Sequence, residues 1–486
     1  MKTTAAVLFM AVAGATAAGG PGIKRLDGTR LDVAEVDATV TRLMGAAEVT
    51  GLALAIFNDG RPVYMKAYGV RDKEKQLPLT PDSVMTAASF SKSTFAYMVM
   101  QLVDEGVIKL DTPVQQYLPR PLPEYEGYES LAGDVHYKQL TPRILLDHSS
   151  GFANLRALEP ERKIAIHFEP GSRYAYSGQG IQLLQLVVEE VTKKPVEDLM
   201  RERIFQPFGM TRTSMVWQER FESDFANGYD EYGRSLGPQR RRTASAAGSM
   251  QTTLADFTRF MQAVAAGKRL RGRTRALMTT PQIQIASKHQ FPTLSPETTD
   301  ENKGIRLSYG LGWGLYATPY GDAFFKEGHD EGWRNYTVYF SKPRVGIIIM
   351  TNSSNGEGIF KELLETLLKN PFTPIEWEGF TPYDRLPPRP PLATHRVVSV
   401  DPARFEVYLG RYRFSADIVL SVRRQGDHLS VQENDEPAQD VYPESERRFF
   451  SRVPDDVLTF EVGVSGRAER MILHTGGRDF TGNRID

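Results

Sequence analysis

Two strand patterns lie far apart in the chain, and a single sheet accommodates both. Near the N-terminus, GLALAIFNDGRPVYMKAYGV places two apolar runs around the turn sequence Asn58-Asp59-Gly60. Far downstream, YTVYF and VGIIIMTN flank Ser341-Lys342-Pro343-Arg344. Each pattern predicts a β-hairpin, and a long mixed region separates the two hairpins. The sequence therefore predicts an α/β domain in which distant parts of the chain close one sheet.

Helical segments surround these hairpins in the sequence. Apolar residues recur at spacings of three and four in residues 32–47, 91–104, 181–191, 254–265 and 360–369. This spacing predicts amphipathic helices, each with one buried face. The expected domain is an antiparallel sheet flanked by helices, with an additional helical lobe.

A proline-rich stretch divides the chain. At 486 residues, two or three domains are expected. PFTPIEWEGFTPYDRLPPRPPLATH favours an extended connector. Short strand patterns follow it, including IVLSV and VLTFEV, and predict a small antiparallel barrel or sandwich. We expect a main domain over 25–370, a linker over 371–396 and a C-terminal β domain over 397–486.

Composition excludes several classes of function. A net charge of −1 gives no reason to expect a nucleic-acid partner. The chain has no Cys, which excludes disulfides, a thiol nucleophile and Cys-ligated zinc. The histidines lack H-x-x-x-H or H-x-H spacing, and no phosphate-binding glycine motif is present. We expect no metal and no cofactor.

The first residues have the order of a signal peptide. In MKTTAAVLFMAVAGATAAGG, Lys2 precedes an apolar run and then Ala15-Thr16-Ala17. We expect a signal peptide over residues 1–18 and export to the periplasm or the medium; the alternative is a short buried or disordered N-terminus. No later stretch reaches about 18 uninterrupted apolar residues, so no transmembrane segment is expected in the mature chain.

The tetrad Ser89-Phe90-Ser91-Lys92 can provide an activated nucleophile. Residues three apart on a helix share a face, so Ser89 and Lys92 meet there. A lysine with a lowered pKa can take the serine proton. The alternative is that Ser89 is a helix N-cap and Lys92 is solvated.

The sequence around the tetrad resembles a known family. TAASFSKSTFAYMVMQLVDEGVIKLDTPVQQYLP is similar to the nucleophile helix of serine β-lactamases and penicillin-binding proteins, in the branch of class C β-lactamases, D-alanyl-D-alanine carboxypeptidases and esterases. LTPRILLDHSSGF, FEPGSRYAYSGQGIQLLQLVVEEVT, IFQPFGMTRTSM, ASAAGSMQTTLADFTRFM and YGLGWGLY continue the resemblance over residues 49–369. It implies a serine hydrolase that forms an acyl-enzyme on Ser89.

Further site residues follow from this resemblance. Tyr176 falls on the motif tyrosine that relays protons, but Gly178 stands where the family usually has Asn. Gln179 is a candidate to supply the missing amide. Lys326 and Gly328 fall on the Lys-Thr-Gly motif of an edge strand, with His329 as the alternative cation. The resemblance also assigns the oxyanion donors to the backbone N–H groups of Ser89 and His329.

Glu327 departs from the family at the position where Thr or Ser helps to bind a substrate carboxylate. A carboxylate there favours an uncharged ester or amide, unless Arg334 compensates. His148 is expected to lie structurally behind the site. Arg240, Arg241 and Arg242 are interpreted as a solvated loop, with an acidic-substrate contact as the alternative.

The C-terminal segment resembles the lipocalin-like β domain that is often appended to this family. DPARFEVYLGRYRF carries Tyr408, Gly410 and Tyr412 in its opening pattern. The expected function of the whole chain is hydrolysis of an ester, D-peptide or β-lactam, with a small molecule or peptide as substrate. The alternative, motivated by Gly178 and Glu327, is a catalytically impaired ligand-binding or sensor protein.

Overall fold

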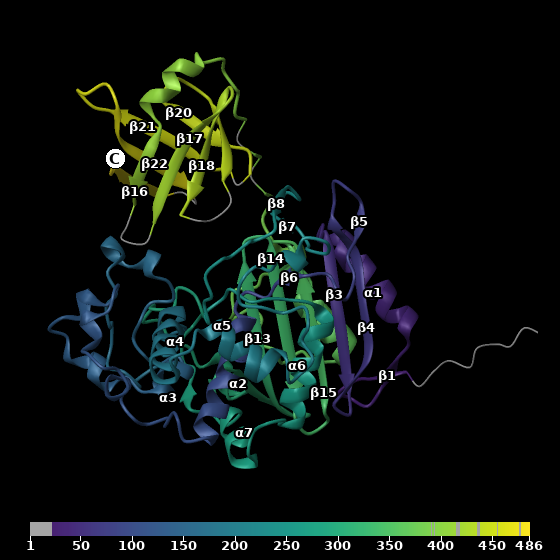
Figure 1. Cartoon of the computed structure of the whole chain (residues 1–486). Helices are drawn as coiled ribbons and strands as arrows, with labels where there is room; N and C mark the ends of the chain where they lie inside the picture. Colours follow the sequence, from purple (N-terminus) through teal and green to yellow (C-terminus); the bar gives the residue numbers. More distant parts are fainter. Residues whose placement is uncertain are drawn as a thin grey trace, which may run out of the picture.

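A nine-stranded antiparallel sheet forms the centre of the larger domain (Figure 1). This computed structural model describes residues 22–389, 391–392, 394–414, 418–434, 438–453, 455–475 and 478–486, so the expected signal peptide lies outside the described residues. In spatial order the strands are β10 (Ile283–Gln284), β11 (Ser308–Tyr309), β12 (Gly314–Thr318), β13 (Gly321–Asp330), β14 (Trp333–Phe340), β15 (Val345–Thr351), β3 (Gly51–Asn58), β4 (Arg61–Asp72) and β5 (Leu77–Pro78). Both predicted hairpins are confirmed, and the β15–β3 pair closes the sheet.

The sheet has a hydrophobic core on each face. Strand β3 is buried along its whole length. Its successive side chains point to opposite faces of the sheet, and both faces are covered. Ala53, Ala55 and Phe57 belong to the core shared with α2 (Phe90–Asp104) and α6 (Leu254–Ala266). Leu52, Leu54 and Ile56 belong to the core shared with α1 (Val33–Ala46) and α8 (Phe360–Leu363), which Leu364–Leu368 continues as a π-helical turn.

Helix α2 is buried all round. Every residue from Phe90 to Leu102 is buried, so the expectation of an amphipathic helix is wrong for this segment. The reason is that α2 lies between the sheet and the helical lobe, which contains α4 (Gly178–Thr192) and α5 (Val196–Met200) (Figure 1). The remaining short elements are β1 (Ile23–Lys24), β2 (Arg30–Leu31), β6 (Met85–Thr86), β7 (Gly228–Tyr229), β8 (Ser235–Gly237), β9 (Gln251–Thr252), α3 (Pro142–Leu146) and α7 (Gly272–Met278).

The first half of the proline-rich stretch packs against the larger domain. Ile375, Trp377 and Phe380 are buried in the core shared with α1 and α8. The Trp377 indole N–H donates to the Ser287 carbonyl at 3.1 Å, and its ring lies 6.0 Å from that of Tyr174. The aromatic side chains therefore pack residues 371–385 against the larger domain despite the proline content.

Trp377 provides a test of this packing. We expect Trp377→Ala to lower the free energy of unfolding by about 3–5 kcal/mol, because a large buried ring is lost and a cavity remains. Denaturant titration measures the change. Leu386→Ala, at a residue that is 48% exposed, is the control and should change the stability by less than about 0.5 kcal/mol. Equal stability of the two variants would show that residues 371–385 are a free linker.

The C-terminal segment is a closed eight-stranded antiparallel barrel, which confirms the expected fold class. Its strands are β16 (Gly410–Arg413), β17 (Val419–Gln425), β18 (His428–Glu433), β19 (Gln439–Pro443), β20 (Arg448–Ser451), β21 (Val457–Val462), β22 (Ala468–Thr475) and β23 (Arg478–Arg484). Tyr412 lies in the barrel core, and its hydroxyl donates to the Tyr408 carbonyl at 2.7 Å.

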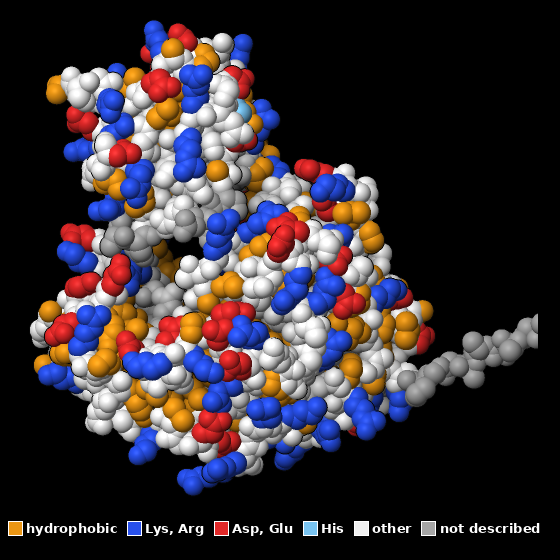
Figure 2. Space-filling model, in the orientation of Figure 1, with side chains coloured by type: hydrophobic (Ala, Val, Ile, Leu, Met, Phe, Trp, Pro, Cys, Tyr) orange, Lys and Arg blue, Asp and Glu red, His pale blue; other side chains and the backbone are white. Residues whose placement is uncertain are grey.

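The barrel stands against the larger domain, with a hollow between them (Figure 2). A cavity of about 660 Å³ lies where barrel residues face Arg162 and the loop from Leu236 to Arg241. The Arg234 guanidinium donates to the Arg452 carbonyl at 3.0 Å across this boundary. Among the described residues, no helix has the length and apolarity needed to cross a membrane.

Candidate active site

Ser89 lies directly before helix α2. Strand β6, which pairs with β9, leads into the turn before Ser89. The Asn335 side-chain amide donates to the carbonyls of Thr86 and Ala87 in this turn, at 3.0 and 3.3 Å. Ala88 has a left-handed φ of 48°, which is costly for a residue with a side chain. The following residue, Ser89, is half-buried and makes no side-chain capping hydrogen bond. The N-cap interpretation therefore does not describe its contacts.

Lys92 meets Ser89 one helical turn later. Its Nζ lies 2.9 Å from the Ser89 Oγ and also donates to the Ala247 carbonyl. The lysine is 4% exposed, so it is not the solvated residue of the alternative interpretation. Burial, together with the positive charge of Lys326, lowers the pKa of Lys92 to about 7. A large fraction of this amine is neutral near neutral pH.

Tyr176 lies between the two lysines. Its hydroxyl accepts a hydrogen bond from the Lys326 Nζ at 2.9 Å, and its ring lies 5.1 Å from the Lys92 Nζ. Burial and the nearby Glu327 charge raise the pKa of Tyr176 well above its usual value, so the group is a neutral phenol at neutral pH. Behind it lies His148, which is buried with its ring 4.4 Å from the Tyr176 ring.

Lys326 is buried on β13 and not solvated. This strand has neighbours on both sides, β12 and β14, so the expectation of an edge strand is wrong. The Lys326 Nζ lies 2.6 Å from the Glu327 carboxylate, which also accepts from the Gln290 side chain at 3.2 Å. The alternative cation, His329, is half-exposed and faces Glu357 at 3.3 Å.

Gly328 permits close contact between β13 and the turn before Ser89. A Cβ atom there would lie 2.7 Å from the Ala87 carbonyl oxygen, closer than real Cβ contacts allow. The position of β13 against the turn before Ser89 therefore depends on a glycine at 328.

The ion pair of Lys326 and Glu327 provides a stability test. We expect Glu327→Gln to lower the free energy of unfolding by about 3–5 kcal/mol at pH 7, because a buried ammonium loses its carboxylate. Burial already lowers the pKa of Lys326, and loss of Glu327 lowers it further, so the deficit should shrink as rising pH removes the proton. Adding Lys326→Met to this variant should recover most of the stability. Additive losses in the double variant, measured by denaturant titration, would contradict a paired role.

Other cations considered in the sequence as substrate contacts form ion pairs. The Arg334 Nε lies 2.6 Å from the Glu357 carboxylate, and Arg241 lies 2.7 Å from Asp330. Arg240 pairs with Glu222 at 2.7 Å. Arg334, Arg240 and Arg241 are therefore each paired with a carboxylate in the described structure.

The segment after Tyr176 contains a contact that the sequence did not indicate. The Gly178 N–H donates to the side-chain oxygen of Asn154 at 2.9 Å. Gln179, expected to supply an amide, is 5% exposed, and its Oε1 has no hydrogen-bond partner in the described structure. The contacts of Asn154 and of the Ala247 carbonyl were missed because each depends on a loop that packs against a distant helix.

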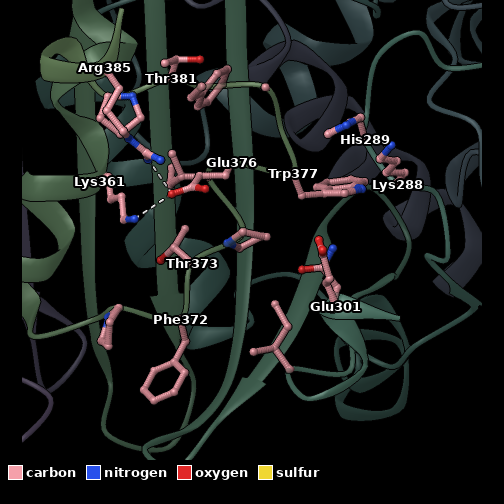
Figure 3. Close-up of a pocket in the computed structure, with 18 residues that line it drawn as sticks. Lys288, His289, Glu301, Lys361, Phe372, Thr373, Glu376, Trp377, Thr381 and Arg385 are labelled. Atoms are coloured by element: carbon pink, nitrogen blue, oxygen red, sulfur yellow. Dashed lines mark hydrogen bonds and ion pairs between the residues drawn. The ribbon is translucent and has the colours of Figure 1, made fainter. Parts of the chain in front are cut away.

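A second cavity lies elsewhere in the larger domain and does not include these residues. It measures about 640 Å³ and is lined by parts of residues 288–305 and 361–385. Figure 3 shows Lys361 and Arg385 pointing toward Glu376, at 2.7 and 2.6 Å from its carboxylate. Ser89, Lys92, Tyr176 and Lys326 do not line it. Among the described residues, no three His, Asp or Glu side chains are grouped so that they could hold a metal ion.

A comparison with protein families identifies the larger domain. The profile of the beta-lactamase family matches residues 36–368. The chain belongs to the beta-lactamase family. It is accordingly a serine hydrolase, and Ser89, Lys92, Tyr176 and Lys326 all lie in the matched region. A second profile, a domain of unknown function named DUF3471, matches residues 394–484 and covers the barrel.

This chain of the beta-lactamase family is similar to curated proteins that are named for several different activities. It is 24% identical over 458 residues to penicillin-binding protein 4* of Bacillus subtilis (strain 168), covering 86% of this chain and 92% of that protein. It is 25% identical over 285 residues to a beta-lactamase of Pseudomonas fluorescens, covering 58% and 74%. It is 23% identical over 329 residues to the teichoic acid D-alanine hydrolase of Staphylococcus aureus, covering 65% and 74%.

Solved structures share the fold of this beta-lactamase family member. The octameric penicillin-binding protein homologue from Pyrococcus abyssi matches with a TM-score of 0.58 at 21% identity, covering 93% of this chain and all of that one. The D-alanine carboxypeptidase AmpC from Burkholderia cenocepacia matches with a TM-score of 0.54 at 22% identity, covering 66% and 95%.

Proposed function

We propose that the protein hydrolyses an ester or amide through an acyl-enzyme on Ser89, with Lys92 as the general base. The observation that carries this proposal is the 2.9 Å contact between the Ser89 Oγ and a buried amine whose pKa is lowered to about 7. The neutral amine takes the serine proton as the Oγ attacks the substrate carbonyl. The resulting tetrahedral intermediate expels the leaving group, and water then releases the acyl group.

Tyr176 and Lys326 complete the proton path in this proposal. The neutral Tyr176 hydroxyl can pass a proton to the leaving group, and the Lys326 Nζ 2.9 Å away stabilises the phenolate that remains. The proton that Lys92 took from Ser89 then returns to this oxygen. The oxyanion donors are the backbone N–H groups of Ser89 and His329, each contributing about 100- to 1000-fold. Gly328 supports this assignment, since it lets β13 approach the turn before Ser89.

The paired charges near these residues favour an uncharged acyl or leaving group. Glu327 neutralises Lys326, and Arg334 and Arg241 are paired with Glu357 and Asp330. A substrate carboxylate would therefore meet no unpaired cation among these groups. Among the activities named for the relatives, ester hydrolysis fits this environment better than cleavage of a peptide with a terminal carboxylate.

The substrate class is tested with three purified substrates. We expect measurable turnover of an activated uncharged ester, and at least tenfold lower kcat/KM for a D-alanyl-D-alanine peptide and for a penicillin. The reverse order would reject the ester assignment while keeping the acyl-enzyme. No turnover of any of the three, with retained ligand binding, would support the alternative of an impaired binding protein, which Gly178 and Glu327 motivate.

The activity should depend on the protonation of Lys92. Below the lowered pKa of about 7 the amine gains a proton and can no longer accept one from Ser89. We therefore expect kcat/KM for an uncharged ester to fall about tenfold per pH unit below pH 7. A steady-state profile from pH 5 to 9 measures this limb. A flat profile between pH 5 and 7 would exclude Lys92 as the titrating base.

Export is part of the proposal. It rests on the order of charge, apolar run and small residues within residues 1–18. The N-terminal sequence of the protein recovered from its native host would identify a cleaved leader.

A further inference from the structure

A run of cations lies between α6 and α7. The eight residues 268–275 include Lys268, Arg269, Arg271, Arg273 and Arg275 and contain no carboxylate. All five cationic residues are exposed, and none of them forms an ion pair within the described ranges of the chain. The whole chain has a net charge of −1, so positive charge is concentrated in this segment.

The segment is anchored to the domain although its cations are exposed. Gly267 ends α6 with a left-handed φ of 64°. Leu270 packs against the hydrophobic core. The Asp104 carboxylate accepts from the Arg271 backbone N–H at 2.6 Å and from the Thr274 hydroxyl. These contacts use the backbone, an apolar side chain and a hydroxyl group, so they do not consume the positive charges.

Two hairpin turns extend this positive surface. The β3–β4 turn carries Arg61, and the β14–β15 turn carries Lys342 and Arg344, all of them exposed. The two turns are adjacent, because the Gly60 N–H donates to the Arg344 carbonyl at 3.0 Å. A cavity of about 270 Å³ is lined both by Lys342 and by Thr279, which follows α7. We call this surface the basic end; it comprises the five cations of residues 268–275 together with Arg61, Lys342 and Arg344.

The carboxylates near the basic end do not neutralise it. Glu105 and Asp322 pair with arginines outside it, at 2.7 and 2.9 Å. Asp104 accepts from a backbone N–H and a hydroxyl, as described above. Asp59, in the β3–β4 turn, is exposed. This single exposed carboxylate faces eight cations, so the basic end carries a strong positive potential.

The basic end lies away from the barrel. Figure 1 shows α7 at the end of the larger domain opposite the barrel, and Figure 2 shows Lys and Arg side chains gathered along this edge. Its cations come from three separate turns. A flat anionic surface can meet three neighbouring turns at once, whereas a linear polyanion binds along a single track of cations.

We propose that the basic end binds the surface of an anionic lipid bilayer and leaves the barrel facing away from it. Each Lys or Arg near such a surface strengthens binding about fivefold, and the attraction is screened by salt. The inference is independent of the acyl-enzyme, because no residue of the basic end belongs to the candidate active site.

The test is sedimentation of the purified protein with vesicles of phosphatidylcholine, either alone or with about 30 mol% phosphatidylglycerol. We expect binding to the anionic vesicles alone, and release as the salt concentration rises from about 0.1 to about 0.5 M. The triple variant with Arg269→Gln, Arg271→Gln and Arg273→Gln should bind the anionic vesicles about 100-fold more weakly, because three charges are removed.

Exposed cations of the barrel provide the charge-matched control. Replacing Arg413, Arg447 and Arg467 by glutamine changes the net charge by the same amount at the other end of the molecule. This control should bind the anionic vesicles within about threefold of wild type. Both triple variants should keep the wild-type melting temperature, since the replaced residues are exposed.

Three outcomes would overturn the proposal. Equal binding of wild type to both kinds of vesicle would assign the binding to apolar contacts. Equal losses in the two triple variants would assign it to net charge and not to the basic end. Absence of wild-type binding to the anionic vesicles would reject a bilayer as the partner, and retention on immobilised heparin in that case would assign the basic end to a linear polyanion.

Discussion

Replacing Ser89 by alanine lowers kcat/KM for an activated ester by about 10⁴-fold or more, because the variant has no nucleophile to form the acyl-enzyme. The remaining rate comes from substrate binding and the oxyanion donors alone. Initial rates of p-nitrophenol release measure the effect over this range. The fold should be unaffected, since the Ser89 side chain makes no capping contact.

A second serine of the same helix provides the matched control. Ser93 is buried, and its hydroxyl donates to the Phe90 carbonyl at 3.0 Å. We expect Ser93→Ala to keep the rate within about threefold of wild type, because one intrahelical hydrogen bond contributes little to catalysis. If Ser89→Ala kept more than a tenth of the wild-type rate, another residue would be the nucleophile.

Replacing Lys92 by methionine lowers kcat by about 10³-fold, within the usual range for loss of a general base. Methionine has a similar length and no charge, so it fits the buried site. The folded protein holds the lysine with a pKa near 7, whereas the unfolded chain has a pKa near its usual 10.5, so burial of this amine opposes folding throughout the range below pH 10.5. The variant should therefore be at least as thermally stable as wild type while it loses activity.

Loss of activity with retained stability distinguishes catalysis from packing at Lys92. Lys109→Met, at an exposed lysine, is the control and should change neither property. A Lys92→Met variant with near-normal turnover would require a different base, whereas a variant with a strongly lowered melting temperature would indicate that the amine serves the fold.

The fold could be predicted where the signal is local. The hairpins β3–β4 and β14–β15 have clear turn sequences, and their separation in the chain requires a sheet closed across a long insertion. Burial of α2 on every side could not be predicted, because it depends on what packs against the helix. The proline content of residues 371–385 suggested a linker, whereas Trp377 and Phe380 anchor this segment to the core.

The candidate site divides in the same way. Ser89 and Lys92 are one helical turn apart, and Tyr176 and Lys326 fall on motif positions, so the sequence predicted them as one site, and the structure brings these four residues together. The ion pair of Lys326 with the adjacent Glu327 was not expected, since neighbouring strand residues normally point to opposite faces. Asn154 was missed because its contact with Gly178 joins residues 24 positions apart through an irregular loop.

The most direct test of the account is the intact mass of the purified protein after exposure to a fluorophosphonate, with Ser89→Ala treated in parallel. The account predicts one adduct per chain on wild type and none on Ser89→Ala, because the reagent needs an activated serine. Equal labelling of both proteins, or no labelling of wild type, would contradict the assignment of Ser89 as the acylated nucleophile.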